Sequence, residues 1–311
     1  MQKGIVTKST GSWYWVKSQN KIVQCRIKGK FRIKGITTTN PIAVGDIVYF
    51  ELNQEDQTGN ITKIDERKNY IIRKSTNLSH EAHIIAANID QAFLIVTLAR
   101  PETSVGFIDR FLITAEAYHI PVHIVFNKID IYDSELLEKL SHYISVYEKI
   151  GYKCHKTSAL EDVGIDEIKA IMDNKISLLS GHSGVGKSTI VNRIDPFLNL
   201  KTAEVSDFHN KGVHTTTFAE MFDLVFGGSI IDTPGIKGFG TVDMPLEDVS
   251  HYFPEIFKAS ENCRFNNCTH LHEPGCAVKD AVKQGDISEI RYTSYVNILT
   301  DSNDKYRQVK Y

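Results

Sequence analysis

The fold of this chain is decided by one short stretch, Gly181-His182-Ser183-Gly184-Val185-Gly186-Lys187-Ser188. It satisfies the pattern G-x-x-x-x-G-K-[ST], in which a glycine-rich loop joins a strand to a helix and turns its backbone N–H groups toward phosphate oxygens. The run 176–179 favours the strand, and 188–194 continues as the helix. We therefore predict that residues 181–189, including Thr189, bind a nucleoside triphosphate, with Lys187 neutralising the β- and γ-phosphates and the Ser188 hydroxyl ligating Mg²⁺.

Two upstream stretches indicate which base is bound. Asn127-Lys128-Ile129-Asp130 follows the strand-like run 121–126, and Thr157-Ser158-Ala159-Leu160 follows the run 152–155. A carboxylate at Asp130 can accept from the two N–H donors on one edge of guanine, a donor pair that adenine lacks. Asn127 suits the remaining polar edge of the base, and the Lys128 stem can cover a base face. Alone, the first tetrapeptide could also be an exposed helix start. The second tetrapeptide resembles the second guanine-binding loop of GTPases, which adds Ser158 and Ala159 to the predicted site.

A third group of motifs follows the phosphate-binding loop. Asp232-Thr233-Pro234-Gly235 comes after the strand-like run 228–231. In GTPases with this type of loop, the aspartate supports the metal and the glycine N–H senses the γ-phosphate. The intervening stretch 212–217 should supply a threonine hydroxyl to Mg²⁺, and we favour Thr216 over Thr215, although either oxygen would serve. The predicted magnesium ligands are thus Ser188, Thr216 and Asp232.

The residue after Gly235 bears on catalysis. Many GTPases place a glutamine there to orient the attacking water, whereas this chain has Ile236. An aliphatic side chain cannot hydrogen-bond water, so slow intrinsic hydrolysis is expected. His214 is the nearest candidate for a substitute catalytic residue, its alternative being an exposed loop histidine. Gly184 also stands where some cation-stimulated GTPases carry asparagine.

A cysteine cluster near the C-terminus predicts a metal site. Cys263-x4-Cys268-x-His270-x5-Cys276 offers three thiolates and an imidazole, and His272 is a rival histidine. This donor set suits a closed tetrahedral zinc site, which would be structural because no position is left open for water. The alternative is a set of reduced cysteines that only pack in the protein core.

The N-terminal part of the chain is strongly basic. Residues 1–45 contain nine Lys or Arg and no Asp or Glu, although the whole chain has 36 basic and 38 acidic residues. Short strand-like runs separated by turns predict a small β-barrel of the oligonucleotide-binding class. The segment 26–34 alternates basic and other residues, so a strand or hairpin there would place several cations on one face. We predict RNA contacts from Arg26, Lys28, Lys30, Arg32 and Lys34; a solvated basic domain without a nucleic-acid partner is the alternative.

Length and composition set the outer limits. With 311 residues, 41% of them hydrophobic and 24% charged, the chain is long enough for two or three globular domains. Strand-like and helical runs alternate from residue 89 to the phosphate-binding loop, which predicts parallel strands with crossover helices. The apolar runs are too short to cross a bilayer, and the N-terminus lacks the apolar stretch of a signal peptide. A cytoplasmic protein is expected.

The order of the motifs is unusual. In ordinary GTPases the phosphate-binding loop comes first and the base-reading motifs come last, whereas here 127–130 and 157–160 precede 181–188. The chain resembles a circularly permuted GTPase, specifically the ribosome small-subunit-dependent GTPase A family of bacteria. The resemblance covers a basic barrel (1–68), a permuted GTPase domain (69–242) and a zinc-binding helical domain (243–311), and it favours His270 over His272.

This resemblance implies a function. A GTP hydrolase of that family would bind the 30S ribosomal subunit and its 16S rRNA, act in late maturation, be stimulated by the subunit and use hydrolysis for release. Mg²⁺ would accompany GTP, one Zn²⁺ would be structural, and nothing demands more than a monomer. Two other hypotheses remain at this stage. An ATP-using RNA-remodelling enzyme would leave the guanine-reading loops unexplained, and a nucleotide-sensing RNA-binding scaffold is consistent with Ile236.

Overall fold

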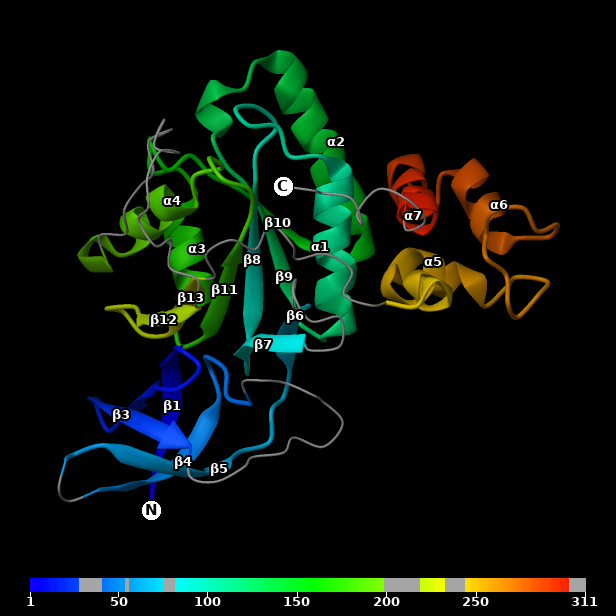
Figure 1. The fold of residues 1–311 in the computed structure, drawn as a ribbon. Coiled ribbons are helices and arrows are strands. Elements are labelled where there is room, and N and C mark those ends of the chain that lie inside the picture. The colour runs from blue at the N-terminus through cyan, green and yellow to red at the C-terminus, as the bar shows by residue number, and fades with distance from the viewer. Residues whose placement is uncertain (28–40, 54–55, 75–81, 199–218, 233–243, 302–311) are drawn as a thin grey trace, which may run out of the picture.

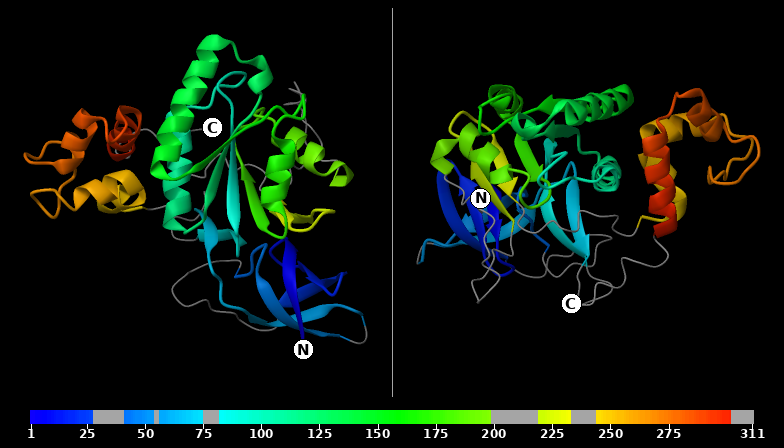
Figure 2. Two further views of the ribbon diagram at one scale, coloured as in Figure 1. Left: turned by 180° about the vertical axis from the view of Figure 1, so that it is seen from behind. Right: turned by 90° about the horizontal axis from the view of Figure 1, so that it is seen from above.

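The computed structural model describes residues 1–27, 41–53, 56–74, 82–198, 219–232 and 244–301. Figure 1 shows an N-terminal barrel below a central α/β layer, with a helical module to one side. The views from behind and from above show that the C-terminal helical module lies beside α1 (Val105–Ala117), on one face of the sheet (Figure 2). Within the described residues, no helix is both long and apolar enough for a membrane span.

The N-terminal strands close into a barrel. Their bounds are β1 (Gln2–Ser9), β2 (Tyr14–Ser18), β3 (Lys21–Ile27), β4 (Ile47–Leu52) and β5 (Gly59–Ile64). They pair in the order β1-β2-β3-β5-β4, and β4 returns to pair with β1. The pair β3–β5 is parallel, while the other pairs in the ring are antiparallel. Inward-facing side chains such as Val6, Val16 and Phe50 are fully buried, so alternation along each strand fills the barrel.

The central sheet holds the predicted α/β pattern. Its strands lie in the order β10 (Lys153–Lys156), β9 (Val122–Phe126), β8 (Gln91–Val96), β11 (Ile176–Ser180), β13 (Ser229–Asp232) and β12 (Glu220–Asp223). All neighbouring pairs are parallel except β12–β13, which is an antiparallel hairpin. Every residue of β8 is buried, as expected for a central parallel strand covered on both faces.

Helices cover both faces of this sheet. On one face, α1 (Val105–Ala117) and α2 (Ser134–Ile150) pack Phe111, Leu112 and Leu140 into one apolar cluster. On the other face, α3 (Ile165–Met172) and α4 (Lys187–Ile194) pack into a second cluster. Local signals set the helix ends: the carboxylate of Asp133 accepts from the backbone N–H of Leu136 at the start of α2, and Gly151 ends α2 with φ 118°. A short 3₁₀ turn, η2 (Pro196–Leu198), follows α4.

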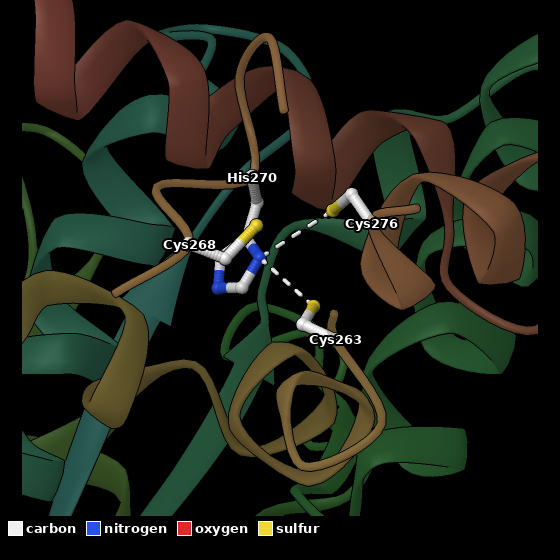
Figure 3. Close-up of side chains that lie close together, drawn as sticks. All are labelled: Cys263, Cys268, His270 and Cys276. Atoms are coloured by element: carbon white, nitrogen blue, oxygen red, sulfur yellow. Dashed lines mark hydrogen bonds between the residues drawn. The ribbon is translucent and has the colours of Figure 1, made fainter. Parts of the chain in front are cut away.

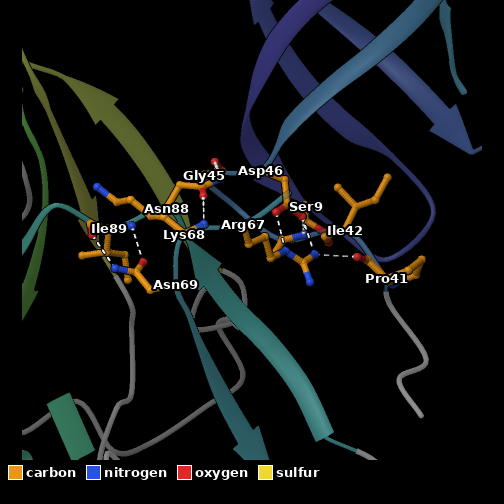
Figure 4. A network of polar contacts seen from close by, with 11 residues as sticks. Ser9, Pro41, Ile42, Gly45, Asp46, Arg67, Lys68, Asn69, Asn88 and Ile89 are labelled. Atoms are coloured by element: carbon orange, nitrogen blue, oxygen red, sulfur yellow. Dashed lines mark hydrogen bonds and ion pairs between the residues drawn. The ribbon is translucent and has the colours of Figure 1, made fainter. Parts of the chain in front are cut away.

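A polar network that includes a buried ion pair lies where the barrel meets the α/β layer (Figure 4). The Arg67 guanidinium donates through Nε and Nη2 to the two carboxylate oxygens of Asp46, at 2.6 Å each, and through Nη2 to the carbonyl of Pro41 at 2.7 Å. Asp46 is fully buried. Beside this pair, the Asn88 amide donates to the Gly45 carbonyl at 2.9 Å. Next along the chain from Arg67 comes the hairpin β6 (Tyr70–Lys74) and β7 (Ala82–Ala87).

The C-terminal helices form a module against α1. The module contains η3 (Leu246–Tyr252), α5 (Pro254–Ser260), α6 (Ala277–Gln284) and α7 (Glu289–Asp301). Its core includes Phe253 and Tyr295, and Ile113 of α1 belongs to the same apolar cluster. The module is therefore packed onto the α/β layer and not merely tethered to it.

Candidate nucleotide site and metal centre

The phosphate-binding loop joins β11 to α4, as the sequence predicts. Gly181, Gly184 and Gly186 have φ values of 143°, 83° and 97°, a region that side chains rarely adopt. A Cβ on Gly186 would lie 2.3 Å from the side-chain nitrogen of Asn127, and a Cβ on Gly181 would lie 2.2 Å from the carbonyl oxygen of Ile95. Glycine is therefore required at both positions, because the loop passes directly over neighbouring backbone and side chains.

The Lys187 ammonium lies inside this loop. Its Nζ donates to the carbonyls of Gly181 and His182, at 2.7 Å each. Burial lowers the pKa of Lys187, and the nearby Asp232 carboxylate acts in the opposite direction. The loop thus holds a partly desolvated cation where backbone N–H groups converge, a setting that favours an anion.

Asn127 connects three loops. Its amide nitrogen donates to the Val185 carbonyl of the phosphate-binding loop at 2.8 Å, and its amide oxygen accepts from the Thr157 hydroxyl at 3.0 Å. Asn127 is only 1% exposed. Sequence reasoning assigned this residue to the edge of the base. The structure adds a bracing role, although one N–H of the amide group remains for a ligand.

The two predicted guanine-reading stretches meet at one point. The Ser158 hydroxyl donates to Asp130 at 2.5 Å, which fixes one carboxylate oxygen. Ser158 follows β10 and Asp130 follows β9, and these strands are parallel neighbours. Nearby, the Lys128 ammonium donates to the Arg100 carbonyl at 2.6 Å. Ala159 is buried behind Ser158, and its carbonyl accepts from Arg193 of α4 at 3.0 Å.

The expected magnesium ligands lie partly within the described residues. Asp232 ends β13 and is in register with Leu179 of β11, just before the phosphate-binding loop. Ser188 is the second residue of α4. A carboxylate and a hydroxyl at the mouth of this loop are oxygen donors of the kind that Mg²⁺ takes. Other predicted residues lie outside the described parts of the chain: His214, Thr215, Thr216, Gly235 and Ile236.

The cysteine cluster is assembled as a metal site (Figure 3). The ligand atoms of Cys263, Cys268, His270 and Cys276 all lie within 4.8 Å of one another. His270 Nδ1 is 3.6 Å from the Cys263 sulfur and 3.5 Å from the Cys276 sulfur. Zinc bonded tetrahedrally to sulfur and nitrogen would separate these ligands by about 3.6 Å, so the donor set and its spacing fit zinc.

Neighbouring groups hold this cluster in shape. The Glu273 carboxylate accepts from the backbone N–H groups of Thr269, Leu271 and His272, which ties the ligand loop into a tight turn. The hydroxyls of Tyr292 and Tyr295 on α7 donate to the carbonyls of His270 and Thr269, at 2.7 and 2.9 Å. His272 is exposed and does not belong to the cluster.

The basic surface of the barrel contains an aromatic group that sequence reasoning missed. The Arg26 guanidinium lies 3.8 Å from the ring centroid of Trp13. Trp13, which is half-buried, lies just before β2, and Arg26, which is exposed, lies near the end of β3. The other predicted RNA contacts, Lys28, Lys30, Arg32 and Lys34, lie outside the described residues.

Comparison with known proteins decides the family. The model of the RsgA GTPase family matches residues 64–242, and that of the RsgA N-terminal domain matches residues 3–61. The chain belongs to the RsgA GTPase family. It is therefore a GTPase, a hydrolase of GTP.

Similar proteins extend over nearly the whole chain. A relative in Bacteroides fragilis strain YCH46, described as small ribosomal subunit biogenesis GTPase RsgA, is 58% identical over 98% of this chain and 99% of its own length. A relative with the same description in Flavobacterium psychrophilum is 57% identical over 98% of this chain and 94% of its own length.

Two solved structures share the fold. YjeQ from Thermotoga maritima is similar with a TM-score of 0.79 and 34% identity, over 98% of this chain and 99% of that chain. YloQ, described as a circularly permuted GTPase, has a TM-score of 0.76 and 32% identity, over 100% of this chain and 97% of that chain. The predicted fold, an N-terminal β-barrel followed by a circularly permuted GTPase domain and a C-terminal Cys3His cluster, is confirmed.

Proposed function

We propose that this chain binds GTP by reading guanine with Asp130, Ser158 and Ala159, while Asn127 and Lys128 hold the surrounding loops. One observation carries this proposal: the Ser158–Asp130 hydrogen bond lies in loops that Asn127 joins to the phosphate-binding loop. A carboxylate with one oxygen fixed in this way is oriented before ligand arrives. It would accept from the two N–H donors of guanine and would find no such pair on adenine.

The phosphates would lie over residues 181–189. Lys187 and the loop N–H groups supply positive charge, and Ser188 and Asp232 supply oxygen ligands for Mg²⁺, which would neutralise phosphate charge during hydrolysis. Thr216 would complete the metal ligands, the Gly235 N–H would sense the γ-phosphate, and His214 would position water where Ile236 cannot. Because the Ile236 side chain cannot hydrogen-bond water, hydrolysis without a partner should be slow.

The partner we propose is the 30S ribosomal subunit with its 16S rRNA. The names of the relatives specify small ribosomal subunit biogenesis. On the barrel, Trp13 and Arg26 supply an aromatic face and a cation, the pair of groups on which unpaired bases and phosphates bind. Lys28, Lys30, Arg32 and Lys34 would extend this surface. The protein would act as a cytoplasmic monomer in late maturation, with hydrolysis stimulated by the subunit and driving release.

We assign these roles to three domains. Residues 1–68 would bind RNA, residues 69–242 would bind and hydrolyse GTP, and residues 243–311 would form the zinc-binding helical domain. Separate apolar clusters support this division, with one cluster filling the barrel, two flanking the central sheet and one filling the C-terminal module. The zinc at Cys263, Cys268, His270 and Cys276 would be structural, because its ligands leave no open position.

The deciding experiment measures GTP turnover with and without purified 30S subunits, with ATP and 50S subunits as controls. Strong stimulation by 30S with GTP alone would support the proposal. Turnover that is unchanged by 30S, despite tight GTP binding, would favour a nucleotide-sensing scaffold.

Base selection is tested separately with Asp130→Asn. An amide at this position cannot accept from both guanine donors but can donate to the second carbonyl of xanthine. The variant should therefore lose GTP affinity and gain affinity for xanthosine triphosphate. Asp133→Asn is the matched control, because Asp133 caps α2 and does not contact Ser158. An unchanged GTP preference in Asp130→Asn would refute the assignment.

A further inference from the structure

Helix α1 touches both the phosphate-binding loop and the C-terminal module. Near its N-terminal end, the Phe107 ring lies 3.8 Å from the His182 ring, measured between centroids. The loop before α1 also reaches this region, because Pro101 ring atoms lie 3.4 and 3.8 Å from where a Cβ on Gly184 would stand. The start of α1 and the phosphate-binding loop are therefore in direct van der Waals contact.

His182 is placed to respond to an anion. Its carbonyl accepts from the Lys187 ammonium at 2.7 Å, and burial, with a smaller contribution from the Lys187 charge, lowers the pKa of the His182 ring. A phosphate entering the loop would compete with the His182 carbonyl for this ammonium. His182 therefore has two contacts that matter here. Its ring packs against Phe107, and its carbonyl holds the ammonium for which a bound phosphate would compete.

Two residues further along α1, a buried ion pair joins the helix to α7. Arg291 Nη1 donates to Asp109 at 2.5 Å, and both side chains are 0% exposed. Arg291 also donates to both carboxylate oxygens of Glu255 on α5, at 2.7 and 3.3 Å. Since Phe107 and Asp109 are about 200° apart around the helix, the two contacts lie on opposite sides of one turn. A shift of that turn would move both together.

From Arg291 the contacts continue to the metal cluster. The next residue, Tyr292, donates to the His270 carbonyl, and Tyr295 one turn on donates to the Thr269 carbonyl. Because Asp109 and Arg291 are both fully buried and packed cores resist continuous deformation, a displacement of α1 would act directly on α7. An unbroken series of contacts therefore leads from the phosphate-binding loop to a metal ligand.

We infer that α1 couples the nucleotide state of the phosphate-binding loop to the C-terminal metal module, through the Phe107–His182 and Asp109–Arg291 contacts. This inference rests on the proposed nucleotide site. It supplies a route within the GTPase domain that does not depend on the segment following Asp232. Coupling is reciprocal: nucleotide binding alters the module, and the state of the module alters nucleotide affinity.

The test uses the full chain with zinc bound and records amide hydrogen exchange with and without saturating GDP. In the wild type, GDP should slow exchange in the phosphate-binding loop and change exchange in α7 by about 5-fold or more. Phe107→Leu removes the ring contact and leaves Asp109–Arg291 in place. In this variant the change at α7 should fall below about 2-fold, while protection of the phosphate-binding loop persists.

Tyr118→Leu is the matched control. Tyr118 is a half-buried aromatic residue at the other end of α1, where it packs against Tyr70 at 5.8 Å between ring centroids. It should behave like the wild type. A second readout is the rate of zinc transfer to a chelator, which GDP should change in the wild type and Tyr118→Leu but not in Phe107→Leu.

The outcomes separate the two proposals. If the wild type binds no GDP, the proposed nucleotide site is refuted. If GDP binds and protects the phosphate-binding loop but α7 exchange does not change, the site stands and the coupling is refuted. Coupling that survives in Phe107→Leu at the wild-type magnitude would likewise overturn the route through α1.

Discussion

Replacing Asn127 by alanine should weaken GDP binding through the phosphate-binding loop and not only through the base. The side chain makes two buried hydrogen bonds, to the Val185 carbonyl and from the Thr157 hydroxyl. Each buried polar group that loses its partner costs about 1–3 kcal/mol, so Asn127→Ala costs about 2–6 kcal/mol when the loop keeps its native geometry. The free loop can relax and avoid part of this cost, whereas the bound loop cannot. We therefore expect GDP affinity to fall by about tenfold or more.

Thr157→Val separates this bracing role from a contact with the base. Thr157 is fully buried and its hydroxyl is bonded to Asn127, so it does not face a ligand. Removing the hydroxyl leaves only the Asn127 oxygen without a partner, a cost of about 1–3 kcal/mol. We expect Thr157→Val to bind GDP about fivefold more weakly than the wild type, which places its affinity between those of the wild type and Asn127→Ala.

The assay is calorimetric titration with GDP, accompanied by urea unfolding of each variant without nucleotide. Unfolding reports how much of the cost already falls on the free protein. The reasoning fails if Thr157→Val binds GDP like the wild type while Asn127→Ala loses tenfold, because Asn127 would then act on the base alone. It fails equally if Asn127→Ala leaves both affinity and stability unchanged.

Three further predictions concern stability and the metal. Asp46→Asn breaks the buried pair with Arg67 and should lower the free energy of unfolding by about 3–5 kcal/mol in urea titrations; a loss below about 1 kcal/mol would contradict the geometry. Cys268→Ser should lower zinc content and the melting temperature, whereas His272→Gln should change neither, as measured by metal analysis and calorimetry. Burial lowers the pKa of His123 to about 4, so between pH 4 and about 6.5 the unfolded chain binds more protons than the folded chain. The free energy of unfolding should therefore fall as the pH drops from about 6.5 toward 4. In His123→Gln, the free energy of unfolding measured against pH should fall less steeply over this range.

The sequence predicts those parts of the site whose residues lie close together along the chain. A phosphate-binding loop needs its glycines, lysine and hydroxyl within a few residues, so 181–188 could be recognised and placed between a strand and a helix. The metal ligands are likewise close in the chain, and their spacing alone indicated the donor set. His270 and His272 could not be separated by spacing, because both lie within reach of the same turn.

Contacts between distant residues could not be predicted in the same way. Asn127 and Val185 are 58 residues apart, and hydrophobic periodicity carries no information on where a buried amide points. Arg291 is fully buried on α7. A helical arginine is ordinarily read as solvent-facing, so the ion pair with Asp109, 182 residues away, leaves no local signal. The Trp13–Arg26 surface was missed because it depends on how β2 and β3 pair.

The circular permutation gives the two appended modules different relations to the nucleotide site. The barrel contacts β12 through Lys8–Glu220 and Lys17–Asp223, ion pairs whose side chains are 31–51% exposed. Such pairs contribute little and are screened by salt. The strand β12 also pairs with β1 of the barrel and leads through its hairpin to Asp232, so the barrel is joined to the metal-binding side of the site by strand pairing as well as by these exposed ion pairs. The C-terminal module is attached through the fully buried Asp109–Arg291 pair. The two modules therefore reach the nucleotide site by different routes: the barrel reaches Asp232 through paired strands, and the C-terminal module reaches the phosphate-binding loop through α1.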